Sequence, residues 1–204
     1  MFRDRQDAAS KLAHALEEYR GKRPLVLAIP RGAVPMGKII AKALDGELDV
    51  VLVRKLRAPG NPEFAIGSVD ETGWTYLSDY AQRMPEKYLE EEKSAQMAVM
   101  RERRASYTPI RAPIDPSGRI VIVVDDGLAT GSTMIAALHA LRAKNPEKLV
   151  CAVPVAPLDT LERIEPYADQ VVCLETPDPF YAVGQFYQAF PQVEDEEVVD
   201  ILKA

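Results

Sequence analysis

The sequence predicts an α/β protein with a doubly wound, mainly parallel five-stranded sheet, flanking helices, a flexible loop with a hairpin, and a small C-terminal hood. Five short apolar runs are continuous rather than alternating, which is typical of parallel strands buried on both faces. Stretches with the 3.6-residue apolar period of a helix lie between most of these runs. With 204 residues, 47% of them hydrophobic, the chain can form one domain, which we place at 1–204.

The five predicted strands are rich in Val, Ile and Leu, as buried parallel strands usually are. They are expected at Leu25–Ile29, Leu48–Arg54, Ile120–Val124, Leu149–Val153 and Gln170–Leu174. These strands define a core at about 25–174.

The helices are expected at 35–45, 85–106, 131–143 and 157–166, with Asp4–Tyr19 before the first strand and a short helix from Glu194. Within 131–143, Met134, Leu138 and Leu141 share one face. Pro35 and Pro85 suit the first turns of their helices.

Two segments interrupt the alternation of strands and helices. Residues 56–67 are rich in Gly and Pro and predict a mobile loop, which leads into a hairpin around Asp70–Gly73, so that loop and hairpin together span about 56–77. Glu175–Pro191 carries many of the aromatic residues outside any regular pattern, and we expect it to form the hood.

Composition excludes several classes of partner. The net charge of −6 argues against broad attraction to nucleic acid or to an anionic membrane. No apolar run approaches the roughly 20 residues of a membrane span, and the charged N-terminus lacks the apolar centre of a signal peptide. Two cysteines and two histidines are too few for a Cys/His zinc site, and both cysteines are expected to be buried in a reducing cytoplasm.

The residues 121–133, VIVVDDGLATGST, carry the clearest chemical signal. Asp125 and Asp126 follow a buried strand, and a loop with three hydroxyls then leads into a helix, where backbone N–H groups favour an anion. A nucleotide triphosphatase loop would need a lysine that is missing here, and the glycine spacing of a dinucleotide fingerprint is absent. Carboxylates beside a phosphate site suit a ligand with vicinal hydroxyls, so the residues predict a ribose 5-phosphate derivative.

This stretch resembles the 5-phosphoribosyl-1-pyrophosphate (PRPP) motif of type I phosphoribosyltransferases, and the order of elements resembles that family over about 25–190. The resemblance implies an enzyme that transfers phosphoribosyl from PRPP to a base with release of pyrophosphate. Asp125 and Asp126 would hold the ribose hydroxyls. The 5′-phosphate would be held by Ala129, Thr130, Gly131, Ser132 and Thr133.

Two basic segments at strand ends are expected to bind the pyrophosphate. IPRGAVP, residues 29–35, resembles the pyrophosphate loop of the family, in which a cis peptide is typical and would fall at Arg31–Gly32. VRKLR, residues 53–57, resembles the family's Arg-Lys pair and contributes Arg54 and Lys55 before the mobile loop. Mg²⁺ would be held through PRPP with Asp125 and Asp126 nearby, and no direct protein ligand is assigned. The alternative interpretation is an ordinary strand–helix turn for the first segment and a solvated basic turn for the second.

The acceptor is the least determined part. Ala129 stands where 6-oxopurine enzymes usually carry an aspartate, and the adenine enzymes have a similar L-A-T-G; Glu63 in the mobile loop is a candidate acid or base. Phe180, Tyr181 and Phe186 could stack on a planar, purine-like base, or simply pack the hood. The whole chain resembles most the predicted bacterial phosphoribosyltransferases of unassigned acceptor.

Three functions remain open at this stage: a cytoplasmic nucleotide-salvage transferase, a PRPP- or nucleotide-binding regulator without catalysis, and a PRPP or nucleotide hydrolase. A homodimer is expected by analogy with the family. Neither nucleic acid nor membrane is expected as a partner.

Overall fold

The computed structural model describes all residues, 1–204, and its centre is a parallel sheet. The order of the strands is β2-β1-β6-β7-β8, all parallel, with β1 between β2 and β6. The bounds are β1 Leu25–Ala28, β2 Glu47–Val50, β6 Ile120–Val124, β7 Lys148–Val155 and β8 Gln170–Glu175. The predicted α/β class and the five-stranded parallel sheet are therefore confirmed.

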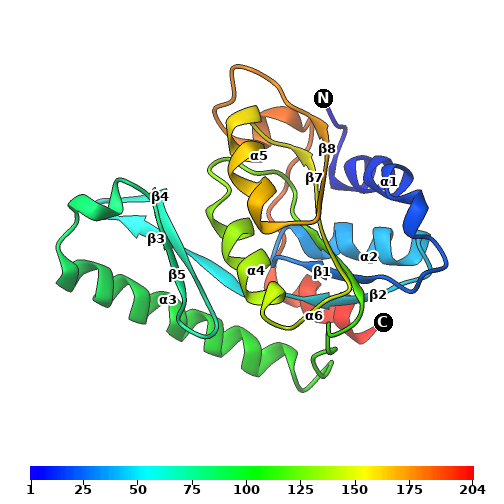
Figure 1. Ribbon diagram of the computed structural model, residues 1–204, viewed down its shortest axis with the longest axis horizontal. Helices are drawn as coiled ribbons and strands as arrows, with labels where there is room; N and C mark the ends of the chain where they lie inside the picture. The colour runs from blue at the N-terminus through cyan, green and yellow to red at the C-terminus, as the bar shows by residue number, and fades with distance from the viewer.

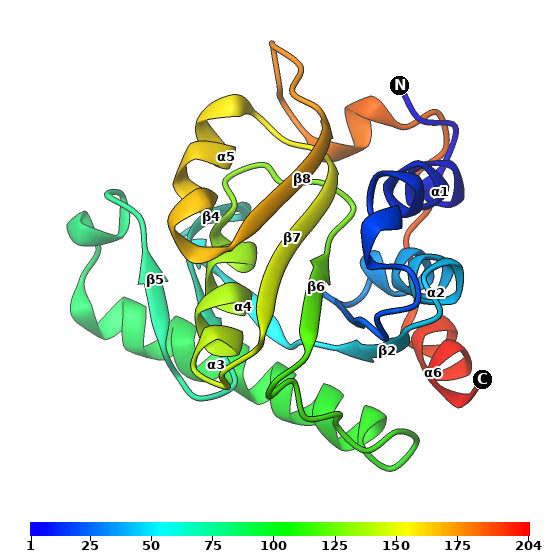
Figure 2. The same cartoon turned by 45° about the vertical axis from the view of Figure 1, so that its right-hand side comes forward.

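The sheet is covered on both faces, which explains its continuous apolar strands (Figure 2). Alternate residues of one strand enter two separate clusters: Ile122 and Val124 face the layer of α1 and α2, whereas Val121 and Val123 face α4. All four side chains are fully buried. A strand with solvent on one face would instead need polar residues at every second position.

Six α-helices surround the sheets. They are α1 Arg5–Ala15, α2 Ala33–Ala43, α3 Glu86–Tyr107, α4 Ser132–Arg142, α5 Leu158–Ile164 and α6 Asp195–Lys203. Each corresponds to a helix predicted from the sequence. None of them is long and apolar enough to cross a membrane.

A second sheet of three antiparallel strands, with α3 along it, forms an arm that stands to one side of the parallel sheet (Figure 1). Its strands are β3 Val53–Ala58, β4 Asn61–Asp70 and β5 Thr75–Leu77. The predicted hairpin turn at Asp70–Gly73 joins β4 to β5. Trp74, which follows this turn, stacks on His139 of α4 at 3.7 Å between ring centroids.

The single strand predicted at Leu48–Arg54 is wrong, because the run contains parts of two strands. β2 ends at Val50 in the parallel sheet, and β3 begins at Val53 in the antiparallel sheet. Val51 and Leu52 between them are both buried. The chain thus changes sheets inside the core, and an apolar run carries no mark of such a change.

The irregular loop predicted at 56–67 is also wrong in its secondary structure. These residues form the end of β3 and the beginning of β4, paired with register shifts between Leu56 and Ala58. Gly60 has φ +72° in the tight connection between the strands. Glycine and proline here make a hairpin tip and a bulged edge rather than an unpaired loop.

The hood is largely irregular and is joined to the N-terminus. Phe2 donates to the Phe186 carbonyl at 2.8 Å and accepts from Gln188 N at 2.8 Å, an isolated parallel bridge. The buried Phe2 ring lies 5.6 Å from the Tyr187 ring. Residues more than 180 positions apart are thereby fixed together beside the carboxyl end of β6.

Candidate functional site

The two acids of the 121–133 stretch lie directly after β6, at the carboxyl edge of the sheet where ligands of such folds bind. The Asp125 carboxylate accepts the backbone N–H of Asp126 at 2.9 Å. Burial, and then the neighbouring Asp126 charge, raises the pKa of Asp125 well above its ordinary value. Burial also raises the pKa of Asp126, against the opposing effect of Arg5. The site thus holds two desolvated carboxylates whose charge is poorly compensated.

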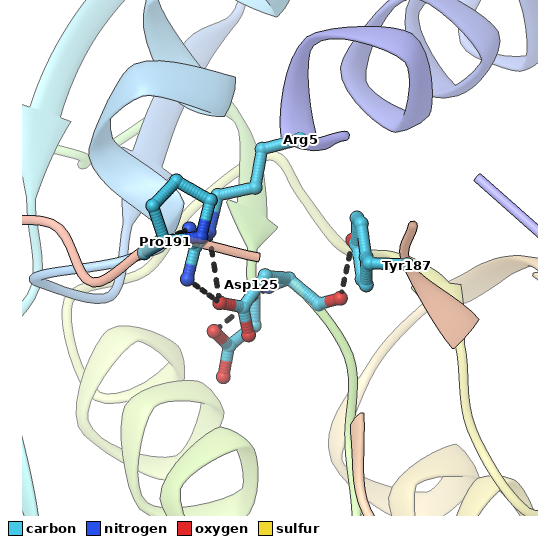
Figure 3. A network of polar contacts seen from close by, with 5 residues as sticks. Arg5, Asp125, Tyr187 and Pro191 are labelled. Atoms are coloured by element: carbon cyan, nitrogen blue, oxygen red, sulfur yellow. Dashed lines mark hydrogen bonds and ion pairs between the residues drawn. The ribbon is translucent and has the colours of Figure 1, made fainter. Parts of the chain in front are cut away.

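Arg5 is a site residue that the sequence reasoning missed. From the first turn of α1 it donates to Oδ2 of Asp126 from Nε at 3.3 Å and from Nη2 at 3.2 Å (Figure 3). The paired side chains are only 12% and 16% exposed. An arginine in a charged N-terminal segment gave no signal of this role, because the contact spans 121 positions in the sequence.

Gly32 lies against the same carboxylate from the side of the predicted pyrophosphate loop. A Cβ at this position would fall 2.4 Å from Oδ2 of Asp126, too close for any side chain without a shift. Its backbone is right-handed helical, with φ −57°, so the requirement for glycine comes from close approach and not from conformation. The structure therefore brings the RGA loop and the Asp126 carboxylate into close approach.

The segment 129–133 leads into α4 as a turn whose amides are open to a ligand. Gly131 is the N-cap residue of α4 with φ +81°; the Ser132 N–H makes a long contact of 3.4 Å to the Thr130 hydroxyl, and no side chain accepts from the next two amides of the helix. The hydroxyls of Thr130 and Ser132 lie 3.1 Å apart. Unpaired N–H groups and adjacent hydroxyls at a helix start have the chemistry of a phosphate site.

Two residues of α5 orient this turn, and they too were missed. The Thr160 hydroxyl donates to the Ala129 carbonyl at 2.7 Å, and Arg163 donates to the Thr130 carbonyl at 3.2 Å. In a trans peptide the N–H points opposite to the carbonyl, so anchoring both carbonyls on α5 turns the next two amides away from that helix. The turn is thereby preorganised for an anion on its other side.

Arg31, the predicted pyrophosphate ligand, is half-buried and engages acids at the start of α6. Its Nη1 lies 3.9 Å from carboxylate oxygens of both Glu194 and Asp195. The non-proline cis peptide of this loop is Pro30–Arg31, so the expectation of a cis bond at Arg31–Gly32 is wrong by one residue. The resemblance placed the cis peptide one residue too late, because the motif alone does not align this loop residue by residue with the family.

The basic residues of β3 are held by α3. Arg54 donates to Gln96 at 3.0 Å, and Arg57 donates to the buried carboxylate of Glu92 at 3.3 Å. Burial, followed by repulsion from Arg103, Arg57 and Arg31, lowers the pKa of Arg54. This crowding of cations is electrostatically unfavourable by itself, and a bound anion would relieve it.

Lys55, between these arginines, is exposed and lies near the acid pair, since its charge lowers the pKa of both Asp125 and Asp126. Glu63, the predicted acid or base, is exposed on β4, and its backbone N–H contacts only the Asn61 side chain at 3.3 Å. Lys55 is thus within electrostatic range of the carboxylates, and Glu63 lies on the exposed part of the hairpin.

The hood aromatics divide into packed and free rings. Phe180 and Phe186 pack on each other with centroids 4.8 Å apart, and both contact the hydrophobic core. Tyr181 is 80% exposed. Tyr187 is buried and donates its hydroxyl to the Asp126 carbonyl at 2.7 Å, so it supports the acid pair from the hood (Figure 3).

A turn with the chemistry of a phosphate site, two carboxylates and a glycine loop thus lie at the carboxyl edge of the parallel sheet, and a basic strand of the arm adjoins this sheet. This is the fold and site class of the type I phosphoribosyltransferases. Residues 4–190 match the family described as the phosphoribosyl transferase domain. The chain belongs to this family.

Known relatives agree with this assignment. A Mycobacterium tuberculosis H37Rv protein, provisionally named a phosphoribosyl transferase, is 42% identical over 99% of this chain. The chain spans 46% of that relative, about half its length. The crystal structure of TT1426 from Thermus thermophilus has a TM-score of 0.82 and 46% identity, covering 99% of this chain and 97% of that one.

More distant structures share the fold alone. A hypoxanthine phosphoribosyltransferase from Staphylococcus aureus has a TM-score of 0.50 at 16% identity, covering 86% of this chain and 74% of that one. At this identity it gives no information on the acceptor of the present chain.

Proposed function

We propose that the chain catalyses Mg²⁺-dependent transfer of the 5-phosphoribosyl group from PRPP to a nitrogenous, purine-like base with release of pyrophosphate. The observation that carries this proposal is the contact between Gly32 and the Asp126 carboxylate, because it joins a pyrophosphate loop to a ribose site. The adjoining phosphate turn, with both carbonyls anchored on α5, supplies the third part of a PRPP site.

In the proposed mechanism the turn from Ala129 to Thr133 holds the 5′-phosphate, while Asp125 and Asp126 accept hydrogen bonds from the ribose hydroxyls. Arg31, Arg54 and Lys55, with the backbone at Gly32, stabilise the pyrophosphate as its bond to the anomeric carbon breaks. A nitrogen of the base then bonds to that carbon, and the proton of this nitrogen passes to solvent or to the departing pyrophosphate. The protein acts by positioning and by electrostatics rather than by covalent chemistry.

The residues fit a metal that arrives with PRPP. No group of three or more His, Cys, Asp or Glu side chains forms a cage in the structure. Mg²⁺ commonly binds through substrate phosphates and few protein ligands, and Asp125 and Asp126 would lie nearby. When bound, it offsets the charge that develops on the leaving pyrophosphate.

The base is proposed to bind under the hood. Tyr181 is the freest aromatic ring there, while Phe180 and Phe186 pack on each other and would offer an edge or a face at the rim. Glu63 would reach the base only if the β3–β4 hairpin closes over the site.

Calorimetry with PRPP and Mg²⁺ tests the proposal, and millimolar-or-better binding is expected. Pyrophosphate release is then measured over a panel of purine and pyrimidine bases, with one base giving turnover. Failure to bind PRPP with Mg²⁺ would exclude the transferase.

A second candidate is a PRPP- or nucleotide-binding regulator. It is favoured by the pairing of Arg31 with Glu194 and Asp195, and of Arg54 with Gln96, because these cations have partners within the protein itself. PRPP binding without pyrophosphate release on any base would support this function. Pyrophosphate release without a base would instead indicate a hydrolase.

We also propose a cytoplasmic homodimer that serves nucleotide salvage, with the arm as a contact region. The arm exposes Phe64 and Tyr80, whose rings lie 5.2 Å apart, edge to face. Scattered surface apolar residues are common, so this pair is modest support. A monomeric mass in solution would contradict the dimer.

A further inference from the structure

Arg5 is held far more tightly than a surface residue of a first helical turn requires. Besides its two hydrogen bonds to Asp126, its Nη1 donates to the Pro191 carbonyl, and its guanidinium carbon lies 3.9 Å from the centroid of the Phe190 ring. A guanidinium that donates on two edges and stacks on an aromatic face is fixed in position. Figure 3 shows it reaching from α1 to the acid pair.

The arginine fixes one oxygen of Asp126. Both of its hydrogen bonds to this carboxylate fall on Oδ2, which also faces Gly32, so Oδ1 receives none from Arg5. The carboxylate is confined between the RGA loop and α1 and cannot turn without losing a charged contact. A carboxylate has lone pairs to spare, so it can accept a ligand hydroxyl while remaining bound to arginine.

The hood completes the support of this carboxylate. The Ala189 N–H donates to the Arg3 carbonyl at 2.9 Å, so the backbone immediately before Arg5 is attached to the hood. Tyr187 holds the Asp126 main chain at 2.7 Å from the same segment. The hood and the N-terminal residues thus form one unit that ends on Asp126.

We propose that Arg5 is a positioning residue for recognition of the ribose hydroxyls, acting through the Asp126 carboxylate rather than by touching the ligand. The proposal deepens the proposed function, on which it rests. Arg5 is expected to set the orientation of the one acid that faces both the RGA loop and the sugar, so that removing it weakens the grip on ribose but not on phosphate.

A double-mutant cycle with two probes tests this role. Arg5→Met should lower the affinity for ribose 5-phosphate, and for PRPP with Mg²⁺, by about tenfold, the size of a typical charged hydrogen bond. Affinity for inorganic phosphate, which needs only the 129–133 turn, should stay within about twofold of that of the unaltered protein, well below the tenfold loss expected for the sugar ligands. In an Asp126→Asn background, adding Arg5→Met should lower the affinity for ribose 5-phosphate by less than about a further twofold, because the effects of residues that act as one unit are not additive.

Two further variants separate positioning from general damage. Arg5→Lys keeps the charge but not the two-donor fork, so it should recover part of the lost affinity for ribose 5-phosphate. Arg3→Met is the matched control: the Arg3 side chain is 78% exposed and pairs only with the Asp7 carboxylate at 3.5 Å, so ribose 5-phosphate affinity should be unchanged.

The outcomes distinguish the two levels of the proposal. If the unaltered protein binds neither PRPP nor ribose 5-phosphate, the proposed function fails. If it binds them and Arg5→Met does not weaken ribose 5-phosphate, the role of Arg5 is refuted while the proposed function stands. The role is also refuted if Arg5→Met lowers ribose 5-phosphate affinity as much in the Asp126→Asn background as in the unaltered protein. It is refuted as well if the affinity for inorganic phosphate falls as much as that for ribose 5-phosphate.

Discussion

The carboxyl edge of the parallel sheet and the antiparallel arm contribute to the same site by different means. At the sheet edge, Asp125 to Thr133 are consecutive in the sequence, and fully buried strands hold them. In the arm, Arg54 and Arg57 are held by α3 residues 42 and 35 positions away in the sequence. The turn proposed to bind phosphate therefore belongs to the buried core, whereas the cations depend on a partly exposed unit.

The difference extends to energetics. The electrostatics of the sheet edge are unfavourable, since burial raises the pKa of both Asp125 and Asp126, and the Asp126 charge raises the pKa of Asp125 further. In the arm, β3 buries only Val53 and Leu56, and the first residues of β4 are exposed, so less apolar contact fixes the arm. Under the proposed function, the buried edge would recognise ribose phosphate and the less tightly packed arm would close over it, the two tasks of a transferase.

The largest expected effect comes from removing the charge of the sheet edge. Asp125→Asn together with Asp126→Asn should weaken PRPP binding about 100-fold or more, because each charged hydrogen bond contributes roughly 1.5–3 kcal/mol. Calorimetry with PRPP and Mg²⁺ measures the change. Asp45→Asn, at an exposed position with φ +55° that asparagine tolerates, is the control. Undiminished binding in the double variant would remove the acids from the site.

Gly32→Ala tests the contact between the loop and the acid pair. The new Cβ would lie 2.4 Å from Oδ2 of Asp126, so the carboxylate or the loop must shift. We expect PRPP affinity to fall about tenfold, the equivalent of about 1.4 kcal/mol. The free energy of unfolding, followed by the melting temperature, should change by less than this amount. A variant that binds PRPP normally would show that the two elements are independent.

Stability should respond in opposite directions to two Asp→Asn changes. The folded pKa of Asp125 is raised, so its ionisation opposes folding: stability falls as pH rises from about 4 through the folded pKa, then stays level. Asp125→Asn should therefore raise the melting temperature at pH 7.5 by a few degrees, about 1 kcal/mol, and the gain should shrink toward pH 4.

Asp169 provides the contrast. Hydrogen bonds from Arg142 and from the Leu149 N–H lower its pKa, so it stabilises the fold above about pH 4 and loses this effect as pH falls through the lowered folded value. Asp169→Asn should lower the melting temperature at pH 7.5. If both variants shifted the melting temperature equally and in the same direction, Asp125 in the site and Asp169 in its ion pair would not differ in their effect on stability.

The smallest expected effect concerns the arm. Glu63→Gln should slow transfer several-fold while PRPP affinity stays the same, the pattern of a group that acts only in the transition state. Steady-state kinetics with the accepted base and calorimetry measure the two quantities, with the exposed Glu86→Gln as control. If neither quantity changes, Glu63 is only solvated surface and the arm acts through its basic residues alone.

Local patterns determined the parallel sheet, the six helices and the phosphate turn. VIVVDDGLATGST specifies a strand, an acid pair and a helix start from neighbouring residues alone, and the structure keeps these in the predicted order. Such features follow from short-range backbone and side-chain preferences, which a sequence records directly.

Only the tertiary structure decided where the chain leaves one sheet for the other and which distant residues reach the acids. The change at Val51–Leu52 is invisible because residues 50–53 form one continuous apolar run across it. The pairing of 56–67 as strands depends on cross-strand hydrogen bonds to a bulged partner. Arg5, Thr160 and Arg163 come to the site through long-range packing of α1 and α5, and a hydrogen bond between residues 31 to 121 positions apart leaves no periodic trace in a single sequence.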